Sequence, residues 1–182
     1  MFTAAITLAF FGFFRSSELC YKKRDRTSNL RHKDVHLSYL RDGTRYATIN
    51  LRKSKANQFQ EEKVYIYENG TSVCAIAAIK KYLRGLGKCN YGDAFFTQGR
   101  TPLTSARFNM LIKQAAMAAG LNPSEYSSHS LRAGAATSAS ESGVPSYLIQ
   151  HLGRWRSGCF KLYVKRPIAA IKRAQLCMTF NC

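Results

Sequence analysis

Residues 127–155 have the sequence SSHSLRAGAATSASESGVPSYLIQHLGRW, and this stretch says more about the fold than any other part of the chain. Its alanine-rich middle, residues 130–142, favours a helix, and Gly143 is the residue type at which helices commonly end. Pro145 then precedes a shorter helical segment, residues 147–152. The stretch therefore predicts two helices joined by a short turn.

A histidine and an arginine, His129 and Arg132, stand at the beginning of the first of these helices. Their spacing of three positions places both side chains on one helical face, where a single phosphate group can meet both. Arginine suits a phosphate because its planar guanidinium donates two parallel hydrogen bonds and keeps its charge. The same spacing also occurs at the solvated starts of ordinary helices, so the pair alone does not assign a function.

The rest of the chain predicts further helices and one small sheet. Residues 34–67 contain a turn at Asp42–Gly43 and many residues that favour strands, which predicts about three antiparallel strands with a basic loop, residues 52–57, between two of them. The other segments expected to be helical are 3–20 (interrupted at Gly12), 72–86 (capped by Ser72), 105–119 (capped by Thr104 or Ser105), 160–164 and 168–178. The expected class is α+β, mostly α-helical, with a small antiparallel sheet near the N-terminal third.

The chain of 182 residues is strongly basic, with 28 Lys and Arg residues against 10 Asp and Glu residues. The resulting net charge of +18 favours a polyanionic partner, foremost a nucleic acid, with a membrane surface or a ribosome as alternatives. Hydrophobic residues make up 46% of the chain, which is enough to form a core and excludes global disorder. The apolar opening MFTAAITLAFFGFF is too short to span a bilayer, so we expect a buried helix there and no membrane association.

The six cysteines form no CxxC pair, which indicates free thiols in a reducing, intracellular compartment. His32 and His36 are four positions apart, but no third metal ligand lies near them in the sequence. We therefore expect neither a metal ion nor a cofactor.

Cleaving DNA without a metal ion requires an attacking oxygen, a proton donor for the leaving oxygen, and positive charge on the non-bridging oxygens. Each candidate side chain has an ordinary explanation when taken singly, such as a helix end, a solvated lysine or a packed tyrosine. Their order along the chain and their flanking residues carry more information. The candidates are Arg15, Lys53, Lys55, His129, Arg132 and Tyr163.

Together these segments resemble the catalytic domain of the tyrosine recombinases, the family of the phage integrases. The similar segments are FGFFRSSEL (11–19), LRKSK (51–55), residues 127–155 and YVKRP (163–167). The resemblance covers residues 3–167 and implies the fold of that family and its activity, which is breaking and rejoining DNA strands. GRWRSGCFKLYVKRP (153–167) is most similar to eukaryotic mobile-element recombinases, the DIRS-like and Crypton-like groups. That similarity implies a transposable element, located in the nucleus of a eukaryotic host or otherwise in the cytoplasm.

The resemblance also implies a set of catalytic side chains: Arg15, Lys55, His129, Arg132, Trp155 and Tyr163. By analogy with the family, Tyr163 attacks the scissile phosphate and forms a 3′-phosphotyrosyl link, releasing a 5′-hydroxyl. Arg15 and Arg132 then hold the non-bridging oxygens, Lys55 gives a proton to the leaving oxygen, and His129 assists the tyrosine.

Three positions of this assignment need comment: the lysine, the acidic residue after Arg15, and the residue that precedes the tyrosine by nine positions. Lys55 fits the family pattern better than Lys53, and Glu18 is expected to orient an active-site side chain. The family usually carries His or Trp nine residues before the tyrosine, but Arg154 stands at that position and Trp155 stands eight residues before it. Either side chain is a candidate for the role, and core packing is the alternative for the tryptophan.

Family members act as tetramers on double-stranded DNA and exchange a C-terminal helix between subunits. Residues 168–182 are the candidate for that exchange, or else a helix that packs on its own domain. The whole chain, residues 1–182, is expected to be the catalytic domain, with the usual N-terminal DNA-clamping domain absent. Two alternatives remain: a decayed or domesticated domain that binds DNA without catalysis, and a type IB topoisomerase.

We predict that the affinity of the chain for duplex DNA falls steeply with salt, because each phosphate contact releases counterions. If six to ten phosphates are contacted, affinity falls roughly 10³–10⁵-fold between about 50 and 200 mM salt. Fluorescence anisotropy over a salt series measures this slope. An affinity that does not change with salt would contradict a phosphate-binding face.

Overall fold

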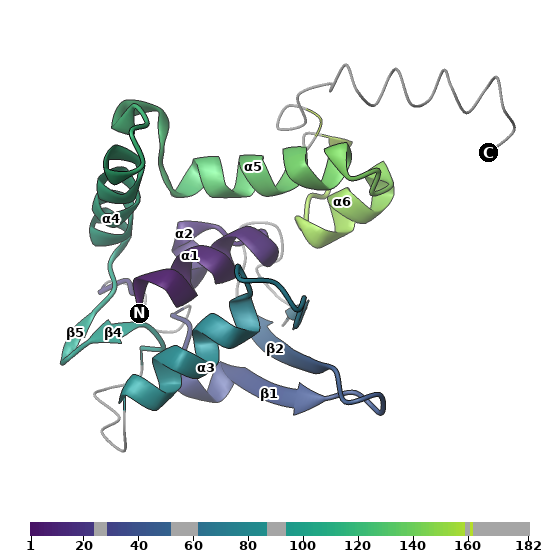
Figure 1. Cartoon of the computed structure of the whole chain (residues 1–182), viewed down its shortest axis with the longest axis horizontal. Helices are drawn as coiled ribbons and strands as arrows, with labels where there is room; N and C mark the ends of the chain where they lie inside the picture. The colour runs from purple at the N-terminus through teal and green to yellow at the C-terminus, as the bar shows by residue number, and fades with distance from the viewer. Residues whose placement is uncertain (24–28, 52–61, 87–93, 159–160, 162–182) are drawn as a thin grey trace, which may run out of the picture.

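The computed structural model of the chain describes residues 1–23, 29–51, 62–86, 94–158 and 161. Within these ranges it is α+β and mostly helical, as the sequence predicts (Figure 1). The elements, in chain order, are α1 (Phe2–Phe11), α2 (Ser16–Leu19), the 3₁₀ helix η2 (His32–Asp34), β1 (Val35–Tyr39), β2 (Arg45–Leu51), β3 (Glu62–Tyr67), α3 (Ala75–Leu86), β4 (Thr97–Gln98), β5 (Thr101–Pro102), α4 (Ser105–Ala118), the 3₁₀ helix η3 (Pro123–Glu125), α5 (Ser128–Glu141) and α6 (Ser146–Leu152).

The small sheet near the N-terminal third has the strand order β1-β2-β3, with both pairs antiparallel. Alternate residues of β2, Ala47, Ile49 and Leu51, are buried, because successive side chains of a strand point to opposite faces. One face of the sheet therefore joins the core, which confirms the expected three-stranded arrangement.

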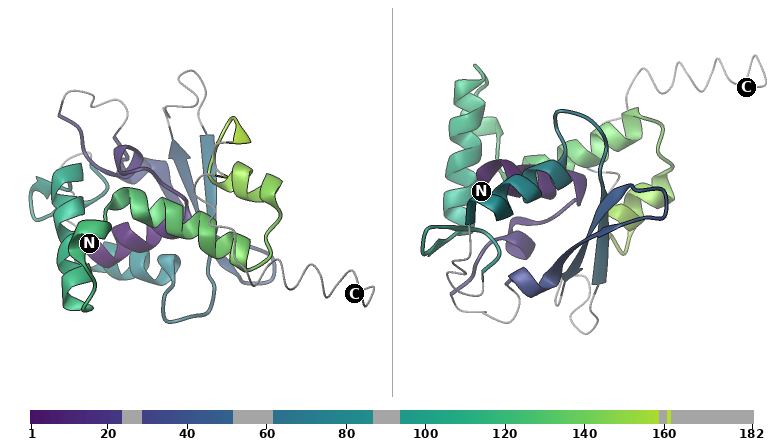
Figure 2. Two further views of the ribbon diagram at one scale, coloured as in Figure 1. Left: turned by 90° about the horizontal axis from the view of Figure 1, so that it is seen from above. Right: turned by 60° about the horizontal axis from the view of Figure 1, so that its bottom comes forward.

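Helix α1 is the centre of the molecule. It lies between α3 and α5 (Figures 1 and 2), and α3 also packs against β2 and β3. Ala4, Ala5 and Leu8 are almost completely buried, so the apolar opening of the sequence is a core helix. Among the described residues, no helix has the length and apolar character needed to cross a bilayer.

The helix expected over residues 3–20 is divided in two, which corrects that expectation. Phe13 adopts a left-handed backbone conformation (φ 51°), which ends α1 and redirects the chain before α2. This turn sends Phe14 into the main core and Phe13 into a second, smaller core with Ala135, Ile149 and Trp155. The turn therefore connects the two hydrophobic clusters.

The remaining helices follow the sequence closely, with two differences at their starts. The Thr104 hydroxyl accepts a hydrogen bond from the backbone N–H of Arg107, as an N-cap should, and α4 begins at the next residue. Helix α3 begins at Ala75, two residues later than a cap at Ser72 requires, and α5 begins two residues before the predicted 130. The helices expected over 160–164 and 168–178 lie outside the described residues, apart from residue 161.

We predict that Gly12→Ala lowers the free energy of unfolding by about 1–3 kcal/mol, as overpacking does. An added Cβ would lie 2.1 Å from a carbon of the Phe14 ring, so the ring must move. Gly85 in α3 is the matched control, because an added Cβ there meets nothing within 4 Å. Gly85→Ala should instead stabilise the protein by about 0.4–1 kcal/mol. Urea denaturation measures both, and equal effects would contradict the close packing at Gly12.

Candidate active site

The first candidate arginine, Arg15, is held by a carboxylate at the start of α2. The Arg15 backbone N–H donates to Glu18 Oε2 at 2.8 Å, and its guanidinium Nη1 donates to Glu18 Oε1 at 2.8 Å. One buried side chain therefore fixes both the backbone and the guanidinium of Arg15. The Arg15 side chain is itself 24% exposed, so it remains accessible to a substrate.

A second arginine, Arg154, reaches the same carboxylate from the other end of the chain. Its Nη2 donates to Glu18 Oε2 at 2.8 Å, and its Nη1 donates to the carbonyl oxygen of Gly12 at 2.9 Å. Arg154 has a left-handed backbone conformation (φ 56°) just beyond α6, and its side chain is only 4% exposed. It is therefore an interior arginine.

The second candidate arginine, Arg132, enters this region from α5. Its two terminal nitrogens donate to the carbonyl oxygens of Phe13 and Gly153. Its guanidinium carbon lies 4.3 Å from the centre of the Trp155 ring, and that ring is perpendicular to the ring of Phe13, with 6.2 Å between the two centroids. Trp155 thus belongs to the smaller core and supports Arg132.

Glu18 is the point on which these side chains converge. Burial alone would raise the pKa of its carboxyl, but Arg154, the backbone N–H and charge of Arg15, and the charge of Arg132 together hold that pKa below its ordinary value of 4.5. Glu18 is therefore ionised at neutral pH. Three guanidinium groups gather around it, which leaves positive charge for an anion such as a phosphate.

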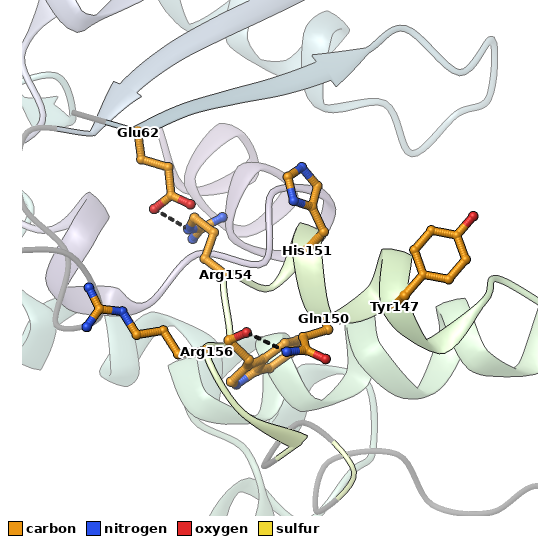
Figure 3. Close-up of a pocket in the computed structure, with 7 residues that line it drawn as sticks. Glu62, Tyr147, Gln150, His151, Arg154 and Arg156 are labelled. Atoms are coloured by element: carbon orange, nitrogen blue, oxygen red, sulfur yellow. Dashed lines mark hydrogen bonds and ion pairs between the residues drawn. The ribbon is translucent and has the colours of Figure 1, made fainter. Parts of the chain in front are cut away.

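A pocket of about 450 Å³ lies beside this cluster (Figure 3). Glu62, the first residue of β3, lies on its wall with its Oε2 3.8 Å from Arg154 Nε. The pocket is also lined by Tyr147, Gln150, His151, Trp155 and Arg156. Figure 3 shows the ring of Tyr147 directed away from Arg154, and that side chain is 73% exposed.

The structure thus brings together three of the side chains proposed from the sequence, Arg15, Arg132 and Trp155. His129 is exposed in the first turn of α5, where its backbone N–H donates to Ser127 Oγ. Lys55 and Tyr163 lie outside the described residues, as does Lys53. Among the described residues, no group of three or more His, Cys, Asp or Glu side chains is placed to hold a metal ion.

Two features of this site were not predicted from the sequence: the inward orientation of Arg154 and the participation of Glu62. The sequence placed Arg154 at a position where a side chain meets substrate. No local sequence signal indicates the inward orientation, because it depends on the left-handed backbone conformation of Arg154 and on its contact with Glu18, 136 positions away.

Comparison with known proteins identifies the family. The profile of the phage integrase family matches residues 2–160. The chain belongs to the phage integrase family. An integrase/recombinase xerD homolog from Selenomonas ruminantium is 29% identical over 164 residues, which is 85% of this chain and 43% of that protein. The chain therefore spans less than half the length of this curated relative.

Solved structures agree on the fold. XerA recombinase superposes with a TM-score of 0.69 at 21% identity, over 96% of this chain and 55% of that one. The XerH site-specific recombinase in a post-cleavage complex with its palindromic difH substrate gives a TM-score of 0.67 at 20% identity, over 94% of this chain and 44% of that one. The chain thus has the fold of a tyrosine recombinase catalytic domain.

We predict that Glu18→Gln lowers the free energy of unfolding at pH 7 by about 3–5 kcal/mol, because Arg154 would remain buried without its counter-charge. Glu68→Gln is the matched control. It breaks a partly exposed pair with Arg45 (3.2 Å) and should cost under about 1 kcal/mol.

The pH dependence follows from the lowered pKa of Glu18. A depressed folded-state pKa contributes stability that is present above the ordinary value of 4.5 and is lost as pH falls through the folded value. The stability difference between wild type and Glu18→Gln should therefore shrink in acid, below pH 4.5. Urea denaturation from pH 7 downward measures it, and a difference that stays constant into acid would contradict an ionised Glu18.

Proposed function

We propose that this chain is the catalytic part of a site-specific recombinase that breaks and rejoins double-stranded DNA through Tyr163. The observation that carries the proposal is the gathering of Arg15 and Arg132 around the buried, ionised Glu18. Membership of the phage integrase family supports it, as does the net charge of +18.

In the proposed reaction, the phenolic oxygen of Tyr163 attacks the scissile phosphorus and forms a 3′-phosphotyrosyl bond. The bond from phosphorus to the 5′-oxygen breaks, and Lys55 gives that oxygen a proton. His129 accepts the tyrosine proton or its hydrogen bond, and Arg15 and Arg132 stabilise the negative charge on the non-bridging oxygens. The covalent link conserves the energy of the phosphodiester, so a second 5′-hydroxyl reverses the reaction without a nucleotide.

Trp155 is the proposed sixth member of this set. Its ring lies against the guanidinium of Arg132, so it acts on the phosphate site through that arginine. On this proposal, the ring keeps Arg132 directed at the phosphate while two carbonyl oxygens hold its terminal nitrogens.

The assignment to a subgroup of the family rests on the segment GRWRSGCFKLYVKRP, residues 153–167. We propose a recombinase of a eukaryotic mobile element, DIRS-like or Crypton-like, which acts on nuclear DNA as a tetramer. Residues 168–182 are the proposed helix that passes to a neighbouring subunit.

We predict that Tyr163→Phe abolishes covalent attachment to DNA and leaves DNA affinity within about threefold, because the change removes one oxygen and keeps the ring. The assay uses the full reading frame that contains residues 1–182 and a nicked substrate whose leaving strand diffuses away. The wild type should give a protein–DNA band that resists denaturant.

The control is Tyr147→Phe, since Tyr147 is exposed and directed away from Arg154. That variant should form the adduct at the wild-type rate. An adduct that survives Tyr163→Phe would overturn the assignment of the nucleophile. No adduct from the wild type would favour a DNA-binding domain without catalysis, and relaxation of supercoils without strand exchange would favour a type IB topoisomerase.

A further inference from the structure

Arg154 occupies the position nine residues before Tyr163, yet its contacts are those of an interior residue. Its Nη1 donates to the carbonyl oxygens of Gly12 and Leu152 at 2.9 and 3.2 Å. Its Nη2 donates to the carbonyl oxygen of Phe13 at 3.2 Å and to Glu18 at 2.8 Å. These protein acceptors engage both terminal nitrogens, and one of them is the buried carboxylate of Glu18, so the charge of Arg154 is already paired inside the protein.

The contact with Glu18 links Arg154 to a proposed catalytic arginine. Glu18 Oε2 accepts hydrogen bonds from both Arg154 Nη2 and the Arg15 backbone N–H, while Oε1 accepts one from Arg15 Nη1. Arg154 therefore fixes the orientation of the carboxylate, and the carboxylate fixes the guanidinium of Arg15. The coupling runs through a chain of two hydrogen bonds.

A second contact links Arg154 to the strand that follows the basic loop. Its Nε is buried and makes no hydrogen bond in the part of the chain that the structure describes, but Glu62 Oε2 lies 3.8 Å away. Glu62 begins β3, directly after the segment that carries Lys55. The guanidinium of Arg154 thus contacts both Glu18, which holds Arg15, and Glu62 at the start of β3.

We propose that Arg154 is a positioning residue that acts through Glu18 to hold Arg15 for catalysis, rather than a group that contacts the phosphate itself. The inference rests on the proposed recombinase function. The charged groups that face Glu18 are Arg15 from the α1–α2 turn, Arg132 from α5 and Arg154 from beyond α6, and Glu62 of β3 faces Arg154. Without Arg154, the buried carboxyl loses its strongest partner and releases Arg15 when it takes up a proton.

The test is a double-mutant cycle on the rate of covalent adduct formation. Arg154→Met should lower the rate about 100-fold, which is the scale of a small misplacement of a catalytic group. In a Glu18→Gln background the same change should cost less than about threefold, because its route to Arg15 is already broken. Equal losses in the two backgrounds would show a direct phosphate contact and overturn the proposal. Arg154→Lys keeps the charge and should recover part of the rate.

A second readout does not depend on activity. The carboxyl carbon shift of Glu18, followed by NMR against pH, should report a pKa below 4.5 in the wild type and a clearly higher one in Arg154→Met. Arg45→Met, on the exposed face of β2, is the control and should leave the titration unchanged. If Arg154→Met does not fold, Arg154→Lys serves for the titration, and Arg154→Lys with and without Glu18→Gln serves for the rate.

The outcomes separate the two proposals. A wild type without an adduct defeats the proposed function, while the Glu18 titration still reports on Arg154. An unchanged titration in the Arg154 variants overturns the positioning role whatever the activity.

Discussion

A buried carboxylate that stays ionised must be surrounded by positive charge, and in this chain Glu18 imposes that requirement on three separate segments. Arg15 comes from the turn before α2, Arg132 from α5 and Arg154 from beyond α6. Ion pairs of this kind stabilise a fold little compared with apolar packing, but removing one partner is costly because the other charge stays buried. The fold therefore fixes the arginines around the carboxylate with high specificity, as a phosphate-binding site requires.

The same turn that places Arg15 also joins the two hydrophobic clusters. The left-handed conformation of Phe13 sends Phe13 and Phe14 into different cores, and its carbonyl oxygen accepts hydrogen bonds from Arg132 and Arg154. A backbone oxygen at a sharp turn lacks a helical partner, so the arginines satisfy it while they are held in place. Packing and site geometry thus depend on the same few residues, and a change at Gly12 or Phe13 affects both.

Much of this arrangement follows from local sequence. Strand alternation, the Asp42–Gly43 turn and the cap at Thr104 depend on neighbouring residues, so the sheet and most helices were predicted. Arg15 and Arg132 were found from their flanking residues.

The features that could not be predicted from the sequence depend on contacts between distant segments. The burial of Arg154 depends on Glu18, 136 positions away, and on the left-handed backbone conformation of Arg154 itself. A glycine would have indicated such a conformation, but an arginine does not. The division of the first helix likewise depends on two separate hydrophobic clusters, because Phe13 packs in one and Phe14 in the other. Lys55 and Tyr163 lie outside the described residues, so their roles remain proposals.

The central claim is that Arg15 and Arg132, gathered around Glu18, form the phosphate site. The most direct measurement is an experimental structure of the Tyr163→Phe protein with its duplex DNA before cleavage. The account predicts one phosphate with non-bridging oxygens at hydrogen-bond distance, about 2.7–3.2 Å, from the guanidinium groups of Arg15 and Arg132, with Arg154 still bonded to Glu18. A phosphate path that passes out of reach of both arginines, or that is contacted by Arg154 in their place, would contradict it.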